Sequence, residues 1–299
     1  MPARLTAYVP DSAAVVGLLE DATVYRIGRA SECELHIGHA SVSRFHAEIV
    51  EQAGLWRVHD TGSKNGLRVD GQLVRVAEFR GDTWFSVGDV HCAFEQLDEA
   101  AASAHREAGL DRRTRSHALS AQLRPELGMS TLLPQALDVV LQLSGLERGF
   151  VLFAGPGEPL RVRASRGLNA DEIGTSQFAG SAAAIDRALA TGKSVVCTDT
   201  LDSPWLGTRP SVRMGGIRAL VCVPLPMAGG ATGVIYVDSR KPGPPVTELD
   251  LELVETIAGN ACTAIEVARV QKRIDDVVAA LAREEAQAPL WQDLRRGAA

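Results

Sequence analysis

The sequence predicts two domains, an all-β sandwich followed by an α+β domain with long flanking helices. Over the first third of the chain, short β-prone runs alternate with turns that contain Gly and Asp, and no long helical period occurs. The remainder mixes strand-like runs with amphipathic helical patterns. The 299 residues suffice for two cores of ordinary size. We therefore expect a first domain at residues 1–98, a linker at 99–115, a second domain at 116–270 and a helical tail at 271–299.

In the first domain, strands are expected where β-branched and aromatic residues lie between turn residues. The clearest runs are residues 23–27, 46–50, 55–59 and 90–95. Beyond them the composition changes, since residues 98–117 are rich in alanine and charge. That composition is typical of a solvated linker or of the start of an exposed helix.

The second domain opens with a helical pattern within residues 119–146, where apolar side chains recur at helical spacing. The uncharged run 219–237 approaches the length of a membrane span, yet its proline and glycine residues would interrupt a helix repeatedly. We therefore expect a β-hairpin with its turn at 228–230, and no membrane contact. A middle helix is expected at 179–190, and strands are expected at 149–153, 160–164, 194–198, 219–225 and 233–238.

Two sequence signals mark helix ends. Gly192 follows the middle helix and precedes a strand, an order that favours a helix C-cap over a phosphate-binding P-loop. The last helix is expected to begin at Thr247, because Thr247 and Asp250 have the spacing of a capping box. Its apolar stripe runs from Leu251 to Leu281, which is longer than one domain core needs. An uncovered stripe on a long helix commonly packs against a second copy, so we expect a homodimer.

Composition and charge restrict the class of protein. With 45% hydrophobic and 23% charged residues, the chain has the composition of a soluble globular protein. Its net charge of -6 opposes binding to nucleic acid or to anionic lipid. The five cysteines form no C-x-x-C pair and the N-terminus has no apolar signal core, so we expect a cytoplasmic protein without a cofactor. Strand alternation scatters the four clustered histidines over different faces, so no metal site is expected at His36, His39, His46 and His59.

Three short segments of the first domain carry its most informative residues. They are Gly28-Arg29, Ser43-Arg44-Phe45-His46 and Asp60-Thr61-Gly62-Ser63-Lys64-Asn65-Gly66. In order and spacing these segments resemble the three loops with which a forkhead-associated (FHA) domain holds a phosphothreonine. The resemblance implies that the architectural residues of these loops are Gly28, His46 and Gly66, with His46 bracing the loop that carries Ser43.

The same resemblance implies a phosphopeptide site formed by Arg29, Ser43, Arg44, Lys64 and Asn65. A planar guanidinium can donate two parallel hydrogen bonds to one phosphate, and a hydroxyl can donate another. The amide of Asn65 can fix the register of a bound backbone. Lys64 and Arg44 depart from the family pattern, which has a small hydroxyl residue and often an asparagine there. Both add positive charge, so attraction of phosphate is kept while the residue preference after the phosphothreonine stays open.

The second half resembles a GAF domain over about residues 116–270, most plainly at 218–225, 233–238 and 248–266. Such domains often enclose a small ligand. The residues typical of cyclic-nucleotide-binding and bilin-binding members are missing here, so the GAF ligand stays open. The positions from which a ligand can be contacted are expected in the long loop that holds Asp199, Asp202, Trp205 and Arg209.

These resemblances together imply a non-enzymatic signalling protein, similar to the sensory front of certain bacterial regulators. We expect it to bind a phosphothreonine-containing protein, such as a Ser/Thr kinase or its substrate, and to sense a small ligand or dimerise through the GAF half. One alternative is a transcription regulator, or the sensory fragment of a sigma-factor-dependent activator, although ATPase and helix-turn-helix motifs are missing. A second is a GAF-type methionine sulfoxide reductase, although the cysteines are scattered. Thr114, in the basic run Arg112-Arg113-Thr114-Arg115, is a candidate kinase target.

Overall fold

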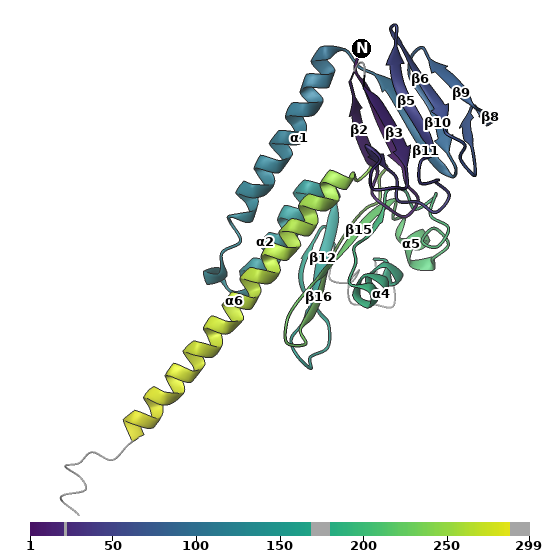
Figure 1. Cartoon of the computed structure of the whole chain (residues 1–299). Helices are drawn as coiled ribbons and strands as arrows, with labels where there is room; N and C mark the ends of the chain where they lie inside the picture. Colours follow the sequence, from purple (N-terminus) through teal and green to yellow (C-terminus); the bar gives the residue numbers. More distant parts are fainter. Residues whose placement is uncertain (21–22, 169–179, 288–299) are drawn as a thin grey trace, which may run out of the picture.

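A computed structural model of the chain describes residues 1–20, 23–168 and 180–287. Within these ranges the chain forms a β-sandwich, a long connecting helix and an α+β domain from which the last helix projects (Figure 1). The predicted fold class is therefore confirmed. Residues 288–299 of the expected tail, and residue 179 of the expected middle helix, lie outside the described residues.

The N-terminal domain is a sandwich of short strands. They are β1 (Ala3–Tyr8), β2 (Val15–Leu19), β3 (Val24–Gly28), β4 (Leu35–His36), β5 (Ala47–Gln52), β6 (Leu55–Asp60), β7 (Leu67–Val69), β8 (Gln72–Val74), β9 (Val76–Phe79), β10 (Thr83–Val87) and β11 (Val90–Gln96). Among the described residues, one sheet has the order β2-β1-β11-β10-β7-β8 and the other has the order β4-β3-β5-β6-β9. Only β3 and β4 pair in parallel there, and the other neighbours are antiparallel.

Apolar side chains that alternate along these strands fill the space between the two sheets. Trp56, Phe79 and Phe94 are buried at its centre. The ring centroid of Phe79 lies 4.9 Å from that of Phe94 and 5.3 Å from that of Phe85. Aromatic packing of this kind makes the sandwich a rigid support for the loops at its ends.

One end of the sandwich faces the second domain. At this end β1 finishes beside the start of β11, and β10 finishes beside the start of β7. In the other sheet, β3 and β6 both finish beside the start of β5. The turn between β1 and β2 reaches the second domain here, since Ala14 N–H donates to Val246 O at 2.8 Å and Ala14 O accepts from Glu248 N–H at 3.0 Å. The three loops singled out in the sequence therefore lie at the end next to the second domain (Figure 1).

The second domain is built on an antiparallel sheet. Its strands are β12 (Arg148–Ala154), β13 (Arg161–Arg166), β14 (Val195–Cys197), β15 (Ala219–Leu225) and β16 (Thr232–Ser239). The described strands pair in the order β13-β12-β16-β15-β14. β15 and β16 form the predicted hairpin. In the part of the chain that the structure describes, no helix is long and apolar enough to cross a membrane.

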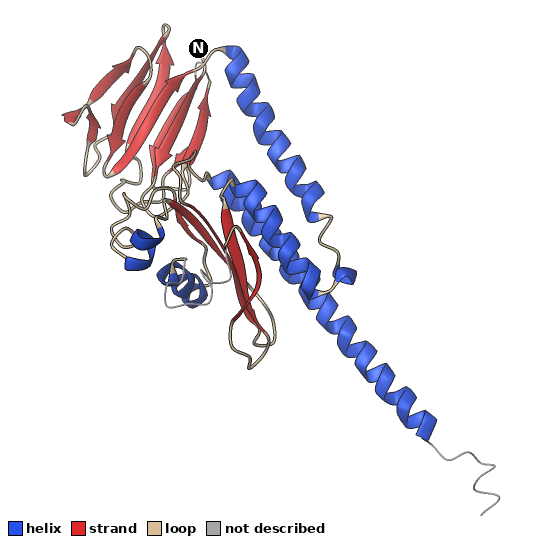
Figure 2. Ribbon diagram, turned by 180° about the vertical axis from the view of Figure 1, so that it is seen from behind, coloured by secondary structure: helices blue, strands red, loops and turns tan. Residues whose placement is uncertain are grey.

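Helices cover both faces of this sheet (Figure 2). They are α2 (Met129–Ser144) and α6 (Glu248–Gln287) on one face, and α4 (Ala182–Thr191) and α5 (Pro210–Gly215) on the other. Gly192 caps α4 in a left-handed conformation and donates to Ala188 O at 2.9 Å, as predicted. The capping box is also confirmed, since Thr247 N–H donates to the Asp250 carboxylate at 2.9 Å and Asp250 N–H donates to Thr247 Oγ1 at 3.2 Å.

The expected linker is helical along its whole length. α1 (Glu99–Ser120) starts at Asp98, whose carboxylate accepts from Ala101 N–H at 2.7 Å, and it runs past the boundary expected at residue 115. Of this helix only Ala102 and Ser116 are buried, and ion pairs join it to α6. Arg112 Nη1 lies 2.7 Å from the Asp250 carboxylate, and Arg113 pairs with Glu252 at 3.2 Å.

The helical pattern expected within residues 119–146 is present as α2, but the helix does not fill that range. α1 ends at Ser120, a short turn leads to η1 (Pro125–Leu127), and α2 begins only at Met129. The physical reason is local, because a proline at position 125 and Gly128 at φ +69° both stop a continuous helix.

Candidate functional site

Arg29 lies directly after β3, at the end of the sandwich that faces the second domain. Its backbone N–H donates to Ser43 O at 2.8 Å, so the loop after β3 and the loop after β4 run side by side. The Arg29 side chain is exposed, and its Nε donates to Val42 O at 3.3 Å. Among the described residues, neither terminal nitrogen of this guanidinium has a hydrogen-bond partner. Both are therefore available to an anion.

Gly28 makes this close approach feasible. A Cβ on Gly28 would lie 2.2 Å from Arg44 O and 2.9 Å from the Cys33 sulfur, both far inside contact distance. A larger residue would push the two loops apart. The glycine before Arg29 thus sets the distance between Arg29 and the loop that carries Ser43.

His46 is buried and joins two loops that are twenty residues apart in the sequence. Its Nδ1 accepts from Ser43 N–H at 3.1 Å, and its Nε2 lies 3.0 Å from Gly66 O. Because Nδ1 accepts, the ring proton lies on Nε2 and is donated to the Gly66 carbonyl. One imidazole therefore fixes the loop of Ser43 against the loop of Asn65.

Two more side chains link these loops. Ser43 Oγ accepts from Lys64 N–H at 3.0 Å, which leaves the hydroxyl proton of Ser43 free to be donated. Asn65 Nδ2 donates to Ser41 O at 2.7 Å, so one amide hydrogen of Asn65 already holds the preceding loop. The Asn65 carbonyl and its second amide hydrogen stay available to a bound backbone. Asn65 and Lys64 are both exposed.

Asp60 organises the loop that carries Lys64 and Asn65, a role that sequence reasoning missed. Its carboxylate accepts from Gly62 N–H at 2.7 Å, from Ser63 N–H at 2.8 Å and from Ser63 Oγ at 2.6 Å. Burial acts to raise the pKa of Asp60, but these hydrogen bonds outweigh it and the pKa lies below its usual value. The pattern of Asp followed by Gly and Ser is a known turn signal and could have revealed the role.

The structure thus joins the loops of Arg29, Ser43, Lys64 and Asn65 through direct hydrogen bonds, and Arg44 follows Ser43 on the same loop. Arg29, Arg44 and Lys64 supply positive charge, and all three are exposed. Ser43 adds a hydroxyl and Asn65 an amide. Donors of this kind, held on neighbouring loops of a rigid sandwich, suit a doubly charged phosphate and an extended backbone beside it.

In the second domain, the three cysteines are buried. Burial raises the pKa of Cys197 and of Cys262 to about 12, and it raises the pKa of Cys222 as well. Their thiolate forms are therefore scarce at neutral pH, and a thiolate is the reactive form of cysteine.

Of the loop positions named as ligand contacts, Asp199 and Asp202 line one hollow between the two domains, whereas Trp205 and Arg209 do not line it. Asp199 is bound by Arg218, with Nη2 and Oδ2 at 2.5 Å, whereas Arg209 Nε donates to Trp205 O at 3.2 Å. Sequence reasoning missed a set of buried polar residues on strands β12 and β16. There Arg148 and Asp238 form a buried ion pair, and the Tyr236 hydroxyl accepts from Ser181 N–H at 3.1 Å.

Comparisons with known proteins bear on both halves. Residues 25–96 match the family described as FHA domain, and residues 126–266 match the family described as GAF domain. No curated protein matches the chain in sequence.

Several solved structures are similar to parts of the chain. An FHA domain from Chlamydia trachomatis is 19% identical, with 33% of this chain and 100% of that chain covered and a TM-score of 0.31. EmbR of Mycobacterium tuberculosis in complex with a low affinity phosphopeptide is 23% identical, with 30% of this chain and 24% of that chain covered and a TM-score of 0.26. The GAF domain region of a protein from Geobacter sulfurreducens is 21% identical, with 48% of this chain and 96% of that chain covered and a TM-score of 0.38.

Proposed function

Since the chain is an FHA domain followed by a GAF domain, we propose that it is a non-enzymatic signalling protein whose first domain binds a phosphothreonine-containing segment of a partner protein. The partner class is a Ser/Thr kinase or a substrate of one. The five binding residues are Arg29, Ser43, Arg44, Lys64 and Asn65. Gly28, His46 and Gly66 hold the loops that present them.

The observation that carries this proposal is the unengaged guanidinium end of Arg29, whose backbone is hydrogen-bonded to Ser43, together with the available hydroxyl proton of Ser43. Two parallel hydrogen bonds from Arg29 and one from Ser43 match three phosphate oxygens. A hydrogen bond to a charged group contributes roughly 1.5–3 kcal/mol, so the pair from Arg29 is worth more than that from Ser43. Because Gly28, rather than Arg29, sets the loop spacing, removal of the Arg29 side chain should leave the fold intact.

Calorimetry of the full chain against a phosphothreonine peptide library tests this function. We expect Arg29→Ala to lose roughly 3 kcal/mol or more, a decrease in affinity of about a hundredfold or more. Ser43→Ala should weaken binding less. Arg80→Ala is the matched control, because the Arg80 side chain is 80% exposed and lies outside the three loops. Equal affinity for phosphorylated and unphosphorylated peptides, or wild-type affinity in Arg29→Ala, would refute the proposal.

We further propose that two copies associate through α6. The second half of this helix leaves a stripe of apolar side chains about half exposed, at the three- and four-residue steps of a heptad: Val267, Val270, Ile274, Val277 and Leu281. A second copy of the same helix matches that stripe in length and chemistry. Light scattering should find a dimer, and Ile274→Glu should dissociate it. Lys272→Glu is the control, since Lys272 is exposed and lies outside the stripe, and it should leave the dimer intact. A monomer at all concentrations would contradict the proposal.

The non-enzymatic part of the proposal rests on the second domain. Its buried thiols with raised pKa values oppose the reductase alternative, since a thiol catalyst needs an accessible thiolate. Five free cysteines also fit a reducing compartment, and we place the protein in the cytoplasm on that ground. Thiol-dependent reduction of free methionine sulfoxide, lost on changing Cys197 or Cys222, would overturn the non-enzymatic assignment. We also propose that the GAF domain senses a small ligand. Ligand screening with the purified protein tests this.

A further inference from the structure

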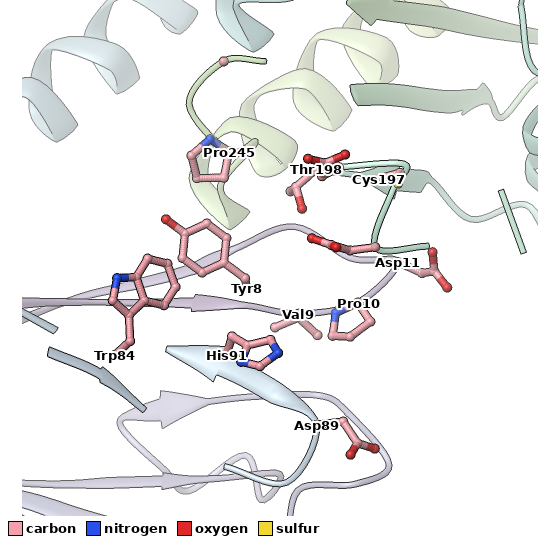
Figure 3. A pocket seen from close by; sticks show the side chains of 13 residues that line it. Tyr8, Val9, Pro10, Asp11, Trp84, Asp89, His91, Cys197, Thr198 and Pro245 are labelled. Carbon is pink, nitrogen blue, oxygen red and sulfur yellow. The ribbon is translucent and has the colours of Figure 1, made fainter. Parts of the chain in front are cut away.

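A hollow of about 520 Å³ lies where the two domains meet. Residues of both domains line it, and Figure 3 shows Tyr8, Trp84 and His91 of the first domain opposite Thr198 and Pro245 of the second. The lining of this interdomain hollow thus exists only when the two domains are joined as they are here.

The interdomain hollow begins beside the loops of the phosphopeptide site. Ser41 connects the two places, because its O accepts from Asn65 Nδ2 at 2.7 Å while its Oγ accepts from Asp89 N–H at 2.9 Å. Asp89 lines the hollow. Gly88, the residue before Asp89, donates its N–H to Gly66 O at 3.3 Å. A chain bound along Asn65 therefore has the hollow as its neighbour.

Charge in the interdomain hollow is of one sign. Four aspartates line it, and no lysine or arginine does so among the described residues. Asp11 is engaged by the Ser203 hydroxyl, and Asp199 is engaged by Arg218. The carboxylates of Asp89 and Asp202 are exposed, and within the described residues neither makes a side-chain hydrogen bond or a direct ion pair, while Asp202 also acts on the Arg218 guanidinium at longer range. These two carboxylates are free to meet a cation.

An aromatic pair completes the lining. The rings of Tyr8 and Trp84 stack with centroids 5.5 Å apart and an interplanar angle of 24°. Trp84 is 59% exposed, although large apolar side chains on strands usually turn inward. An exposed indole face attracts ammonium and guanidinium groups through its quadrupole. Free carboxylates and an aromatic face together favour an organic cation with an apolar stem, as lysine and arginine side chains have.

We propose that the interdomain hollow receives a lysine or arginine side chain of the same partner segment whose phosphothreonine binds at Arg29. This inference rests on the proposed function and adds a preference to it. The positive residues Arg29, Arg44 and Lys64 lie next to the negative hollow at Asp89 and Asp202, so the matching ligand carries a phosphothreonine with a basic residue near it in the sequence. A metal ion is not the favoured occupant, because no three His, Cys, Asp or Glu side chains among the described residues are grouped closely enough to hold one.

The test is fluorescence anisotropy of the full chain with phosphothreonine peptides in an alanine background. A single lysine is moved through the positions on both sides of the phosphothreonine, and each peptide has a glutamate counterpart. We expect lysine at one or two positions to strengthen binding about fivefold. The double variant Asp89→Asn with Asp202→Asn should remove this gain and keep the affinity for the lysine-free peptide within about twofold.

Two further variants sharpen the result. Trp84→Ala should reduce the lysine gain without changing the requirement for phosphate. Asp70→Asn makes the same charge change in the first domain, outside the hollow, and should keep the gain in full.

Three outcomes would overturn the inference. Lysine and glutamate peptides of equal affinity at every position would do so, and so would a lysine gain that survives the double variant. If a free polyamine binds with the same dependence on Asp89 and Asp202 while peptides show no lysine preference, the hollow is a small-molecule site instead. A phosphate requirement that persists in these cases leaves the proposed function standing, whereas its absence in every peptide removes both.

Discussion

Replacement of His46 by alanine should loosen the phosphopeptide site although His46 itself faces no ligand. The imidazole makes two hydrogen bonds, from Ser43 N–H at 3.1 Å and to Gly66 O at 3.0 Å. Half-buried Ser43 N–H would lose its partner, which costs about 1–2 kcal/mol, whereas Gly66 O would keep the longer hydrogen bond from Gly88 N–H at 3.3 Å. Loss of the fully buried imidazole ring also destabilises the domain, because it leaves a cavity.

The expected effect on binding is smaller than the effect on stability. Once the loop of Ser43 is no longer fixed against the loop of Asn65, a bound peptide must order both. An ordering cost of about 1 kcal/mol lowers the affinity for a phosphothreonine peptide about fivefold. Hydrogen exchange of the strand amides in the first domain measures the stability change, since it reports local opening in a chain of two domains. Calorimetry measures the affinity.

His59→Ala is the matched control, because His59 lies on β6 in the same domain and has no hydrogen bond to its ring among the described residues. We expect this variant to have the amide hydrogen exchange and the phosphopeptide affinity of the unchanged chain. The reasoning fails if His46→Ala keeps full protection of the strands next to these loops. It also fails if affinity drops about a hundredfold with stability unchanged, since His46 would then contact the ligand directly.

Three further outcomes are expected. Because burial raises the pKa of Cys197 to about 12, a thiol reagent at pH 8 should label it only after denaturation, and rapid native labelling would contradict this burial. Arg148→Ala should destabilise the second domain by about 3–5 kcal/mol, because Asp238 would be left buried and unpaired, and urea denaturation of the variant checks this. Hydrogen bonds keep the pKa of Asp60 below its usual value despite burial, so its stabilisation is present above the unfolded pKa of about 4 and is lost as the pH falls through the lower folded value. Asp60→Asn should reduce this loss of stability at low pH, as measured by amide exchange over a range of pH. An unchanged loss would show that Asp60 contributes little.

Local signals in the sequence predicted much of the fold. The strand expected at 219–225 has those bounds in the structure, because proline and glycine punctuate it on both sides. Gly192 and Thr247 mark helix ends by conformational needs that act within one turn. The helix from Glu99 was only half predicted, because the ion pairs that join it to α6 link residues more than a hundred positions apart.

The site was predicted less completely than the fold, for a physical reason. Residue types and order pointed to Arg29, Ser43 and Asn65, but the contacts that unite them cross between loops. The bond from His46 to Gly66 spans twenty residues, and that from Asn65 to Ser41 spans twenty-four. No periodicity encodes such distances. Sequence reasoning named Asp199 and Asp202 on one wall of the interdomain hollow but missed the opposite wall, because that wall comes from residues near positions 10 and 90 in the other domain.

The length of α6 has a mechanical consequence. The helix is 40 residues long, so at 1.5 Å per residue it measures ~60 Å. Its first residue, Glu248, is hydrogen-bonded to Ala14 of the first domain, and its other end stands far beyond the sheet (Figure 1). A stiff rod held at one end behaves as a lever. A tilt of about 5° where the first domain grips it would carry the far end through ~5 Å, a displacement close to one helical turn.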